Sequence, residues 1–183
     1  MWLVVTLFVL LGFLFSNAGG NTYFALLTEP RMMISSPPVV LQTGTVGNST
    51  IYTNGTSARI SAVAPISAPT DYNFVLKVVN NVSDHWKIRL KTYSQSKIER
   101  LNNCTIYFRN VSDGFSGQVY IVNGNYTLQT GPWYDWPASA AEIYIAVTLQ
   151  ANNPEVSYVN VYLEILIPDK TTYAQYVLTF EFT

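Results

Sequence analysis

Side chains that commonly perform catalysis are scarce in this chain of 183 residues, which contains one His, one Cys and eleven carboxylates. A Ser-His-Asp or Cys-His mechanism would have to use His85, which follows Asp84 at a predicted turn-to-strand junction, where a solvated imidazole is the common finding. Cys104 lies on the apolar face of a predicted strand, as a small buried hydrophobic residue does. The carboxylates are scattered singly, without the pair that glycoside hydrolysis needs. The sequence therefore predicts no catalytic residue and a protein that is not an enzyme.

Metal, cofactor and nucleic-acid binding have little support either. One His and one Cys cannot form a His- or Cys-based metal site. Asp113, Asp135 and Asp169 lie near predicted turns and carry the oxygen ligands that Ca²⁺ takes, but no DxDxD-type run joins them, so a Ca²⁺ site is left open. The net charge of −1 and the charged fraction of 11% argue against a nucleic-acid partner. We expect no cofactor, and N-linked glycans as the only covalently attached groups.

Asn-X-Ser/Thr sequons carry the clearest chemical signal. Six of them follow the N-terminal segment, and glycans on them would supply the solubility that the few charged residues do not. The simpler alternative is that a surface rich in Asn and Thr produces sequons incidentally. The predicted glycosylation sites are Asn48, Asn54, Asn81, Asn103, Asn110 and Asn125.

An aromatic loop is the main candidate for ligand or partner binding. Residues 131–137, GPWYDWP, place Trp133, Tyr134 and Trp136 between two prolines, where they can stack on sugar rings or anchor a partner. Equally, the two Trp side chains can plug one end of a β-sandwich. Seven of the ten basic residues fall in 77–109, a region that includes Lys87, Arg89 and Lys91 on one strand face. The simplest interpretation of that strand face is a solvated surface that discourages edge pairing.

Strands must position these residues, because apolar and polar residues alternate with period two from Pro37 onward. Turn dipeptides separate the alternating segments, and Asn123-Gly124 predicts a two-residue hairpin. This pattern predicts an all-β fold, an antiparallel β-sandwich or jelly-roll-like domain over residues 37–183. The predicted strands are 72–79, with Tyr72, Phe74, Leu76 and Val78 on one face, 86–91, 104–109, 142–149, 159–167 and 174–182, and, more weakly, 38–46, 57–63, 118–122 and 125–129.

Residues 1–18 form a hydrophobic leader. The apolar run over 2–15 is short for a bilayer span but suits a secretory signal peptide, and Ser16 and Ala18 predict cleavage before Gly19. No Lys or Arg precedes the run, so two alternatives stay open: a retained membrane anchor and the hydrophobic helix of a pilin-like subunit. In each case we expect a secreted or cell-surface protein, with membrane contact only through residues 1–18 if they are retained.

A second apolar segment lies at 19–36, before the predicted sandwich. Its residues 22–28 carry no charge and are apolar on both faces, so free in water they would aggregate. The simplest assignment is the first strand of the chain's own sandwich. Gly19-Gly20 before it and a Pro-containing linker after it favour a donor strand that completes the sheet of a neighbouring subunit, a head-to-tail contact that generates a filament. The predicted subunit contacts are Thr22, Tyr23, Phe24, Ala25, Leu26, Leu27 and Thr28.

This layout resembles archaeal extracellular filament subunits of the thread and bundling-pilus type, whose fold is similar to the bacterial biofilm-matrix fibre protein. The resemblance rests on the leader, the uncharged apolar strand, a Tyr/Thr/Asn-rich sandwich without disulfides and the sequons. It implies a jelly-roll-like subunit in a homopolymer, with an inserted strand at about 21–28 and outer-surface glycans. It further implies contacts with neighbouring filaments or cell surfaces in adhesion or biofilm. The alternatives are a membrane-anchored or pilin-like glycoprotein that binds carbohydrate or a protein through residues 131–137, and a viral surface protein.

Overall fold

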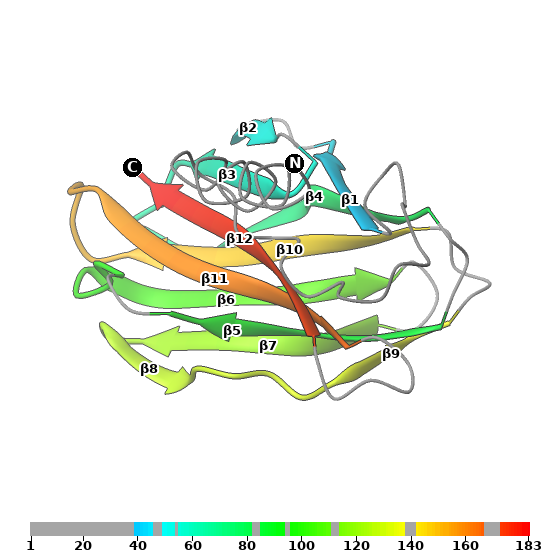
Figure 1. Cartoon of the computed structure of the whole chain (residues 1–183). Coiled ribbons are helices and arrows are strands. Elements are labelled where there is room, and N and C mark those ends of the chain that lie inside the picture. Colours follow the sequence, from blue (N-terminus) through cyan, green and yellow to red (C-terminus); the bar gives the residue numbers. More distant parts are fainter. Residues whose placement is uncertain are drawn as a thin grey trace, which may run out of the picture. The chain divides into compact units, whose positions relative to one another are not determined.

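The computed structural model of the chain places strands throughout the region predicted to be a sandwich (Figure 1). Two compact units divide the chain, Met1–Ser35 and Ser36–Thr183, and all described residues belong to the second. The expectations for the leader, for the donor segment 22–28 and for Asn48, Asn54, Asp113 and Asp169 lie outside the described residues. The structure describes residues 39–45, 49–53, 55–81, 85–93, 96–110, 114–137, 142–166 and 173–183.

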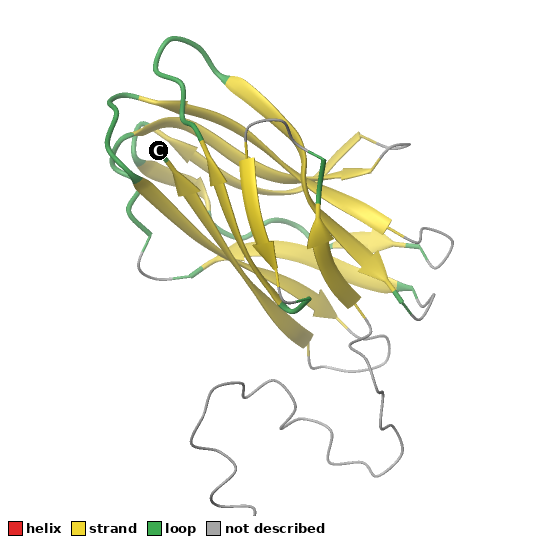
Figure 2. Cartoon of the chain, turned by 90° about the horizontal axis from the view of Figure 1, so that it is seen from above, coloured by secondary structure: helices red, strands yellow, loops and turns green. Residues whose placement is uncertain are grey.

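The described residues form two six-stranded sheets, which we call sheet A and sheet B, and consist of strands and loops only (Figure 2). Every pair of neighbouring strands is antiparallel except β3 and β12. The predicted all-β, antiparallel-rich sandwich is confirmed. Sheet A contains, in spatial order, β1 (Val39–Thr43), β4 (Thr70–Asn80), β10 (Glu142–Ala151), β6 (Leu101–Asn110), β7 (Gly114–Val122) and β8 (Asn125–Leu128). Sheet B contains β2 (Ser49–Thr53), β3 (Ser57–Ala62), β12 (Tyr173–Phe182), β11 (Ser157–Leu166), β5 (Trp86–Thr92) and β9 (Tyr134–Trp136).

The alternating apolar residues of both sheets meet in one core. In β5 the side chains of Trp86, Ile88 and Leu90 are buried, whereas the basic residues between them are exposed or half-buried. Each such aliphatic side chain contributes about 1.5–3 kcal/mol on full burial. Cys104 is fully buried in the same core, and burial raises the pKa of its thiol. The prediction that Cys104 is a small buried residue is confirmed.

One predicted core position is wrong. Phe74 was expected to face inward with Tyr72 and Leu76, but its ring lies on the outer face of sheet A and makes an edge-to-face contact with Tyr144, with ring centres 4.8 Å apart. The backbone of Phe74 has φ of 60°, and the pairing of β4 with β10 shifts register between Ile145 and Val147. At this irregularity three residues of β4, 73–75, stand opposite the single residue Ala146, while Tyr72 and Leu76 on either side both face the core. The surplus residues break the alternation locally and turn Phe74 outward.

Gly44 is needed beside this bulge, because a Cβ there would lie 1.7 Å from the carbonyl oxygen of Phe74. We expect Gly44→Ala to lower the free energy of unfolding by about 2–3 kcal/mol, since the backbone must move to relieve the overlap. Gly55→Ala is the matched control: its φ of 89° is unfavourable, but the nearest atom to a Cβ lies 3.5 Å away. Its cost should be about 1 kcal/mol. Equal costs in denaturant unfolding would contradict the role of Gly44.

The hairpin predicted at Asn123-Gly124 is confirmed. These two residues join β7 to β8, and their φ angles of 48° and 72° are both left-handed, as a type I′ turn requires. No helix long and apolar enough to span a membrane occurs among the residues that the structure describes.

The two ends of the sandwich are defined by where its first and last described residues lie. Val39 pairs with Asn80 at the end of β4, so the chain enters the sandwich at the end that we call the entry end. At the other end, Ala64 N donates a hydrogen bond to Thr183 O, and Ala151 N donates one to Pro65 O. Ala151 ends β10, next to the start of β4. The last residue therefore lies at the opposite end of the sandwich, which we call the far end (Figure 1).

Candidate functional site

The predicted aromatic loop divides into a buried and an accessible part. Trp136 in β9 is fully buried and lies opposite Trp86 across the β5–β9 pair. The indole N–H of Trp86 donates a hydrogen bond to Asn80 Oδ1 over 3.1 Å. The expected ligand contact at Trp136 is therefore corrected, because its ring plugs the core at the edge of sheet B. Tyr134 is half-buried and packs against the core, with its ring centre 6.2 Å from that of Phe108.

Trp133 is half-buried, like Tyr134, and it is positioned by an ion pair whose carboxylate is buried. The guanidinium of Arg89 lies over its ring, with Cζ 4.2 Å from the ring centre. Arg89 Nε donates to Glu164 Oε2 over 2.6 Å, and Gln175 Nε2 donates to the other carboxylate oxygen over 2.9 Å. The Glu164 side chain is fully buried, so both of its oxygens need these partners. Arg89 is thus part of a fixed cation–π contact rather than a simple solvated charge.

Exposed charges lie on the same loop as Trp133 and on the neighbouring strand β5. Asp135 lies 3.5 Å from Lys87 Nζ and 3.7 Å from His85 Nε2, and all three side chains are exposed. The expected solvated state of His85 is confirmed. Among the residues that the structure describes, no three His, Cys, Asp or Glu side chains gather into a metal-binding group.

Tyrosines extend the outer face of sheet B beyond Trp133. Tyr162 stands two residues before Glu164 on β11, about 7 Å along the strand, and is cross-strand partner to Lys91. Its ring stacks on that of Tyr93, with centres 4.3 Å apart. The face therefore combines half-buried aromatic rings with amide and charged groups, a combination that suits sugar rings or a protein surface.

The described sequons differ in accessibility. Asn81 and Asn125 have exposed side chains, and Asn125 Nδ2 donates to Asn123 O over 2.9 Å. Asn103 is half-buried on the outer face of β6, and its Oδ1 is buried without a hydrogen-bond partner. Asn110 is the last residue of β6, near the entry end. Asn81 and Asn125 are therefore the most accessible glycan acceptors among the described side chains.

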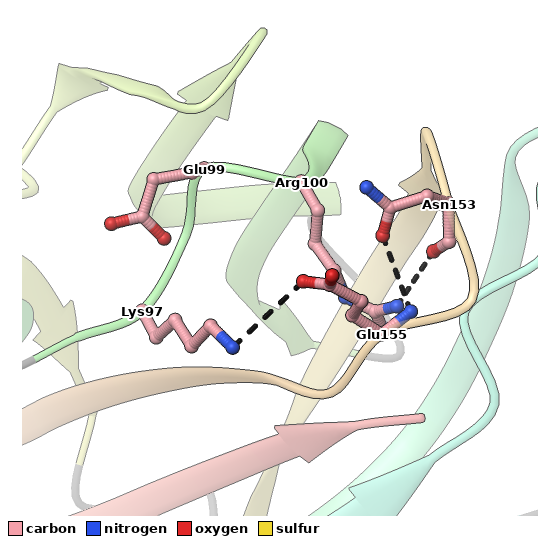
Figure 3. Close-up of a pocket in the computed structure, with 5 residues that line it drawn as sticks. All are labelled: Lys97, Glu99, Arg100, Asn153 and Glu155. Atoms are coloured by element: carbon pink, nitrogen blue, oxygen red, sulfur yellow. Dashed lines mark hydrogen bonds and ion pairs between the residues drawn. The ribbon is translucent and has the colours of Figure 1, made fainter.

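A hollow of about 290 Å³ at the far end contains a buried arginine that sequence analysis did not single out (Figure 3). Arg100 donates to Ser157 Oγ over 2.7 Å, to Asn153 O over 2.6 Å and to Phe182 O over 2.9 Å. Lys97 and Glu155 point toward one another across the hollow at 3.9 Å. Arg100 follows Lys97 and Glu99 in a charged turn, so its sequence context predicts solvation and gives no signal of burial.

No protein-family model and no curated protein matches the chain. Among solved structures, the N-terminal domain of PorA covers 79% of this chain and 95% of its own length, at 10% identity and a TM-score of 0.44. The ASH/PapD-like domain of human CEP192 covers 90% and 98%, at 10% identity and 0.41. The CooA pilin subunit of enterotoxigenic Escherichia coli covers 80% and 98%, at 10% identity and 0.40. These likenesses concern the β-sandwich fold, so function has to be argued from the chain's own residues.

Proposed function

We propose that this protein is a structural, non-enzymatic subunit of a glycosylated extracellular filament, joined by a strand that each subunit donates to the next. One observation carries the proposal. All strands of the two described sheets come from residues 39–182, and the segment 22–28, uncharged and apolar on both faces, precedes them in the sequence. A segment that is apolar on both faces needs a protein surface to cover it, and a second copy offers one without closing the assembly.

The surface chemistry of the sandwich supports an extracellular location. Only 11% of the residues are charged, and the outer faces of both sheets carry tyrosines instead. Glycans on exposed sequons such as Asn81 and Asn125 would keep such a surface soluble. The subunit needs no cofactor for this role, and adhesion or biofilm formation would use the glycosylated outer faces.

The test compares the exported full chain with the variant Phe24→Lys/Leu26→Lys, by light scattering and electron microscopy. The wild-type chain should form filaments, and the variant should remain a folded monomer, because two charges on one strand face cannot be buried in a neighbour. Thr22→Lys/Thr28→Lys places the same charges at the segment's ends and should weaken assembly less. A monomeric wild-type chain, or filaments formed equally by Phe24→Lys/Leu26→Lys, would overturn the proposal.

A second candidate function is binding of carbohydrate or a protein partner by a monomeric surface glycoprotein. The fixed stack of Trp133 on Arg89, with Tyr162 on the same face of sheet B, favours it. Donor-strand assembly ranks first because binding through this face would leave the apolar segment 22–28 without a protein surface to cover it.

A further inference from the structure

Arg100 is a buried cation without a direct counter-ion among the residues that the structure describes. Its residue is 4% exposed, and its three hydrogen bonds all go to uncharged oxygens. Within the described residues, none of the carboxylates lies within the 4.0 Å of an ion pair with it. Burial lowers the pKa of the guanidinium, and the more distant charge of Glu155 offsets part of this effect. Buried charges are usually paired, so this position suits an incoming carboxylate.

Two exposed apolar side chains lie at the same end of the sandwich. Val63 and Ile66 are 56% and 50% exposed, on the loop between β3 and β4. Tyr72 donates to Val63 O over 2.6 Å, and Gln150 Nε2 donates to Ile66 O over 3.3 Å, so the loop is held in place.

Backbone bonds connect this loop to the hollow at Arg100. Ala64 N donates to Thr183 O, and the carbonyl of Phe182, one residue earlier, accepts from Arg100. Asn152 N donates to Arg100 O, and Ala151 N donates to Pro65 O. The apolar pair and the buried guanidinium therefore belong to one surface at the far end, which we call the far-end surface.

We propose that the far-end surface accepts residues 22–31 of a second copy, an inference that rests on the proposed function. Phe24 and Leu26, which share one face of the strand, would cover Val63 and Ile66. The Glu29 carboxylate would enter the hollow beside Arg100 and Lys97. Arg31, two residues further, would face Glu99 and Glu155. In this arrangement Glu29 would oppose the two cations of the hollow, and Arg31 would oppose its two carboxylates.

The length of the linker after the donor segment agrees with this occupant. Residues 29–38 connect it to Val39 at the entry end, and an extended chain of ten residues spans at most about 35 Å. A subunit can therefore place its segment on the far end of the next subunit in line. Because Val39, where the linker joins the sandwich, and the far-end surface lie at opposite ends of the sandwich, a contact of this kind between two copies is heterologous and repeats without closing.

The test measures the concentration at which the exported full chain assembles, by light scattering. Val63→Asp/Ile66→Asp should raise this concentration at least tenfold, and so should Glu29→Lys. Adding Lys97→Glu to Glu29→Lys should restore at least part of the loss, because the charges again oppose. Leu128→Asp is the matched control: Leu128 is another large hydrophobic residue exposed among those described, at 37%, but lies on edge strand β8. The Leu128→Asp variant should assemble at the same concentration as the wild-type chain.

Circular dichroism establishes that each variant is folded, which the exposed positions favour. Wild-type assembly by both Val63→Asp/Ile66→Asp and Glu29→Lys, with Phe24→Lys/Leu26→Lys monomeric, would overturn the far-end surface while the filament proposal stands. A loss of assembly in Leu128→Asp equal to that in Val63→Asp/Ile66→Asp would also overturn it. A wild-type chain that never assembles would instead overturn the filament proposal itself.

Discussion

Replacing Arg89 with Ala is expected to lower the free energy of unfolding by about 3–5 kcal/mol. The loss comes less from the ion pair itself than from Glu164, whose fully buried carboxylate would keep only the hydrogen bond from Gln175. Removing one member of a buried pair leaves an uncompensated charge in a medium that solvates it poorly. Unfolding in guanidinium chloride, followed by circular dichroism, measures this loss of stability. The measurement uses the Phe24→Lys/Leu26→Lys background, so that assembly does not contribute.

Two further variants separate this cause from a general loss of contacts. Adding Glu164→Gln to Arg89→Ala should recover most of the stability, because the neutral amide needs no counter-ion. Lys87→Ala, on the same strand, should cost no more than about 0.5 kcal/mol, since its partner Asp135 is exposed. If Arg89→Ala costs as little as Lys87→Ala, Glu164 is solvated and Trp133 has no rigid support.

Alternation predicted the strands well because each sheet has one face in the core. All ten strands expected from the sequence are present, and Cys104 and the hairpin at Asn123-Gly124 lie where the pattern places them. The strands β2 and β9 were missed. β9 has only three residues, and its pairing with β5 depends on tertiary contacts that no local pattern encodes.

The errors concern positions where a neighbouring element decides the outcome. Phe74 fits the apolar alternation, but the bulge that turns it outward is paired with β10, some 70 residues away. Glu164 and Arg100 are charged residues in contexts typical of solvated surface, yet both are buried. Their partners come from other strands, at sequence separations of 75 for Arg89–Glu164 and 57 for Arg100–Ser157. Local spacing cannot predict such pairs.

Trp133 and Trp136 are three residues apart, and the structure predicts opposite responses to truncation. Trp136→Ala should lower the free energy of unfolding by about 3–5 kcal/mol, because a fully buried indole leaves a large cavity opposite Trp86. Trp133→Ala should cost clearly less, because its indole keeps contact with solvent, so that truncation leaves no closed cavity, and its cation–π contact with Arg89 contributes about 1 kcal/mol. Denaturant unfolding of both variants on the monomeric background provides the comparison.

Their difference also determines how the aromatic loop can be tested for binding. A folded Trp133→Ala protein that loses affinity for an immobilised oligosaccharide would have lost a surface contact, and the second candidate function would gain support. The same loss in Trp136→Ala would report only a damaged core. If the two substitutions destabilise the protein equally, Trp133 is also part of the core, and the outer face of sheet B has no aromatic anchor at this loop.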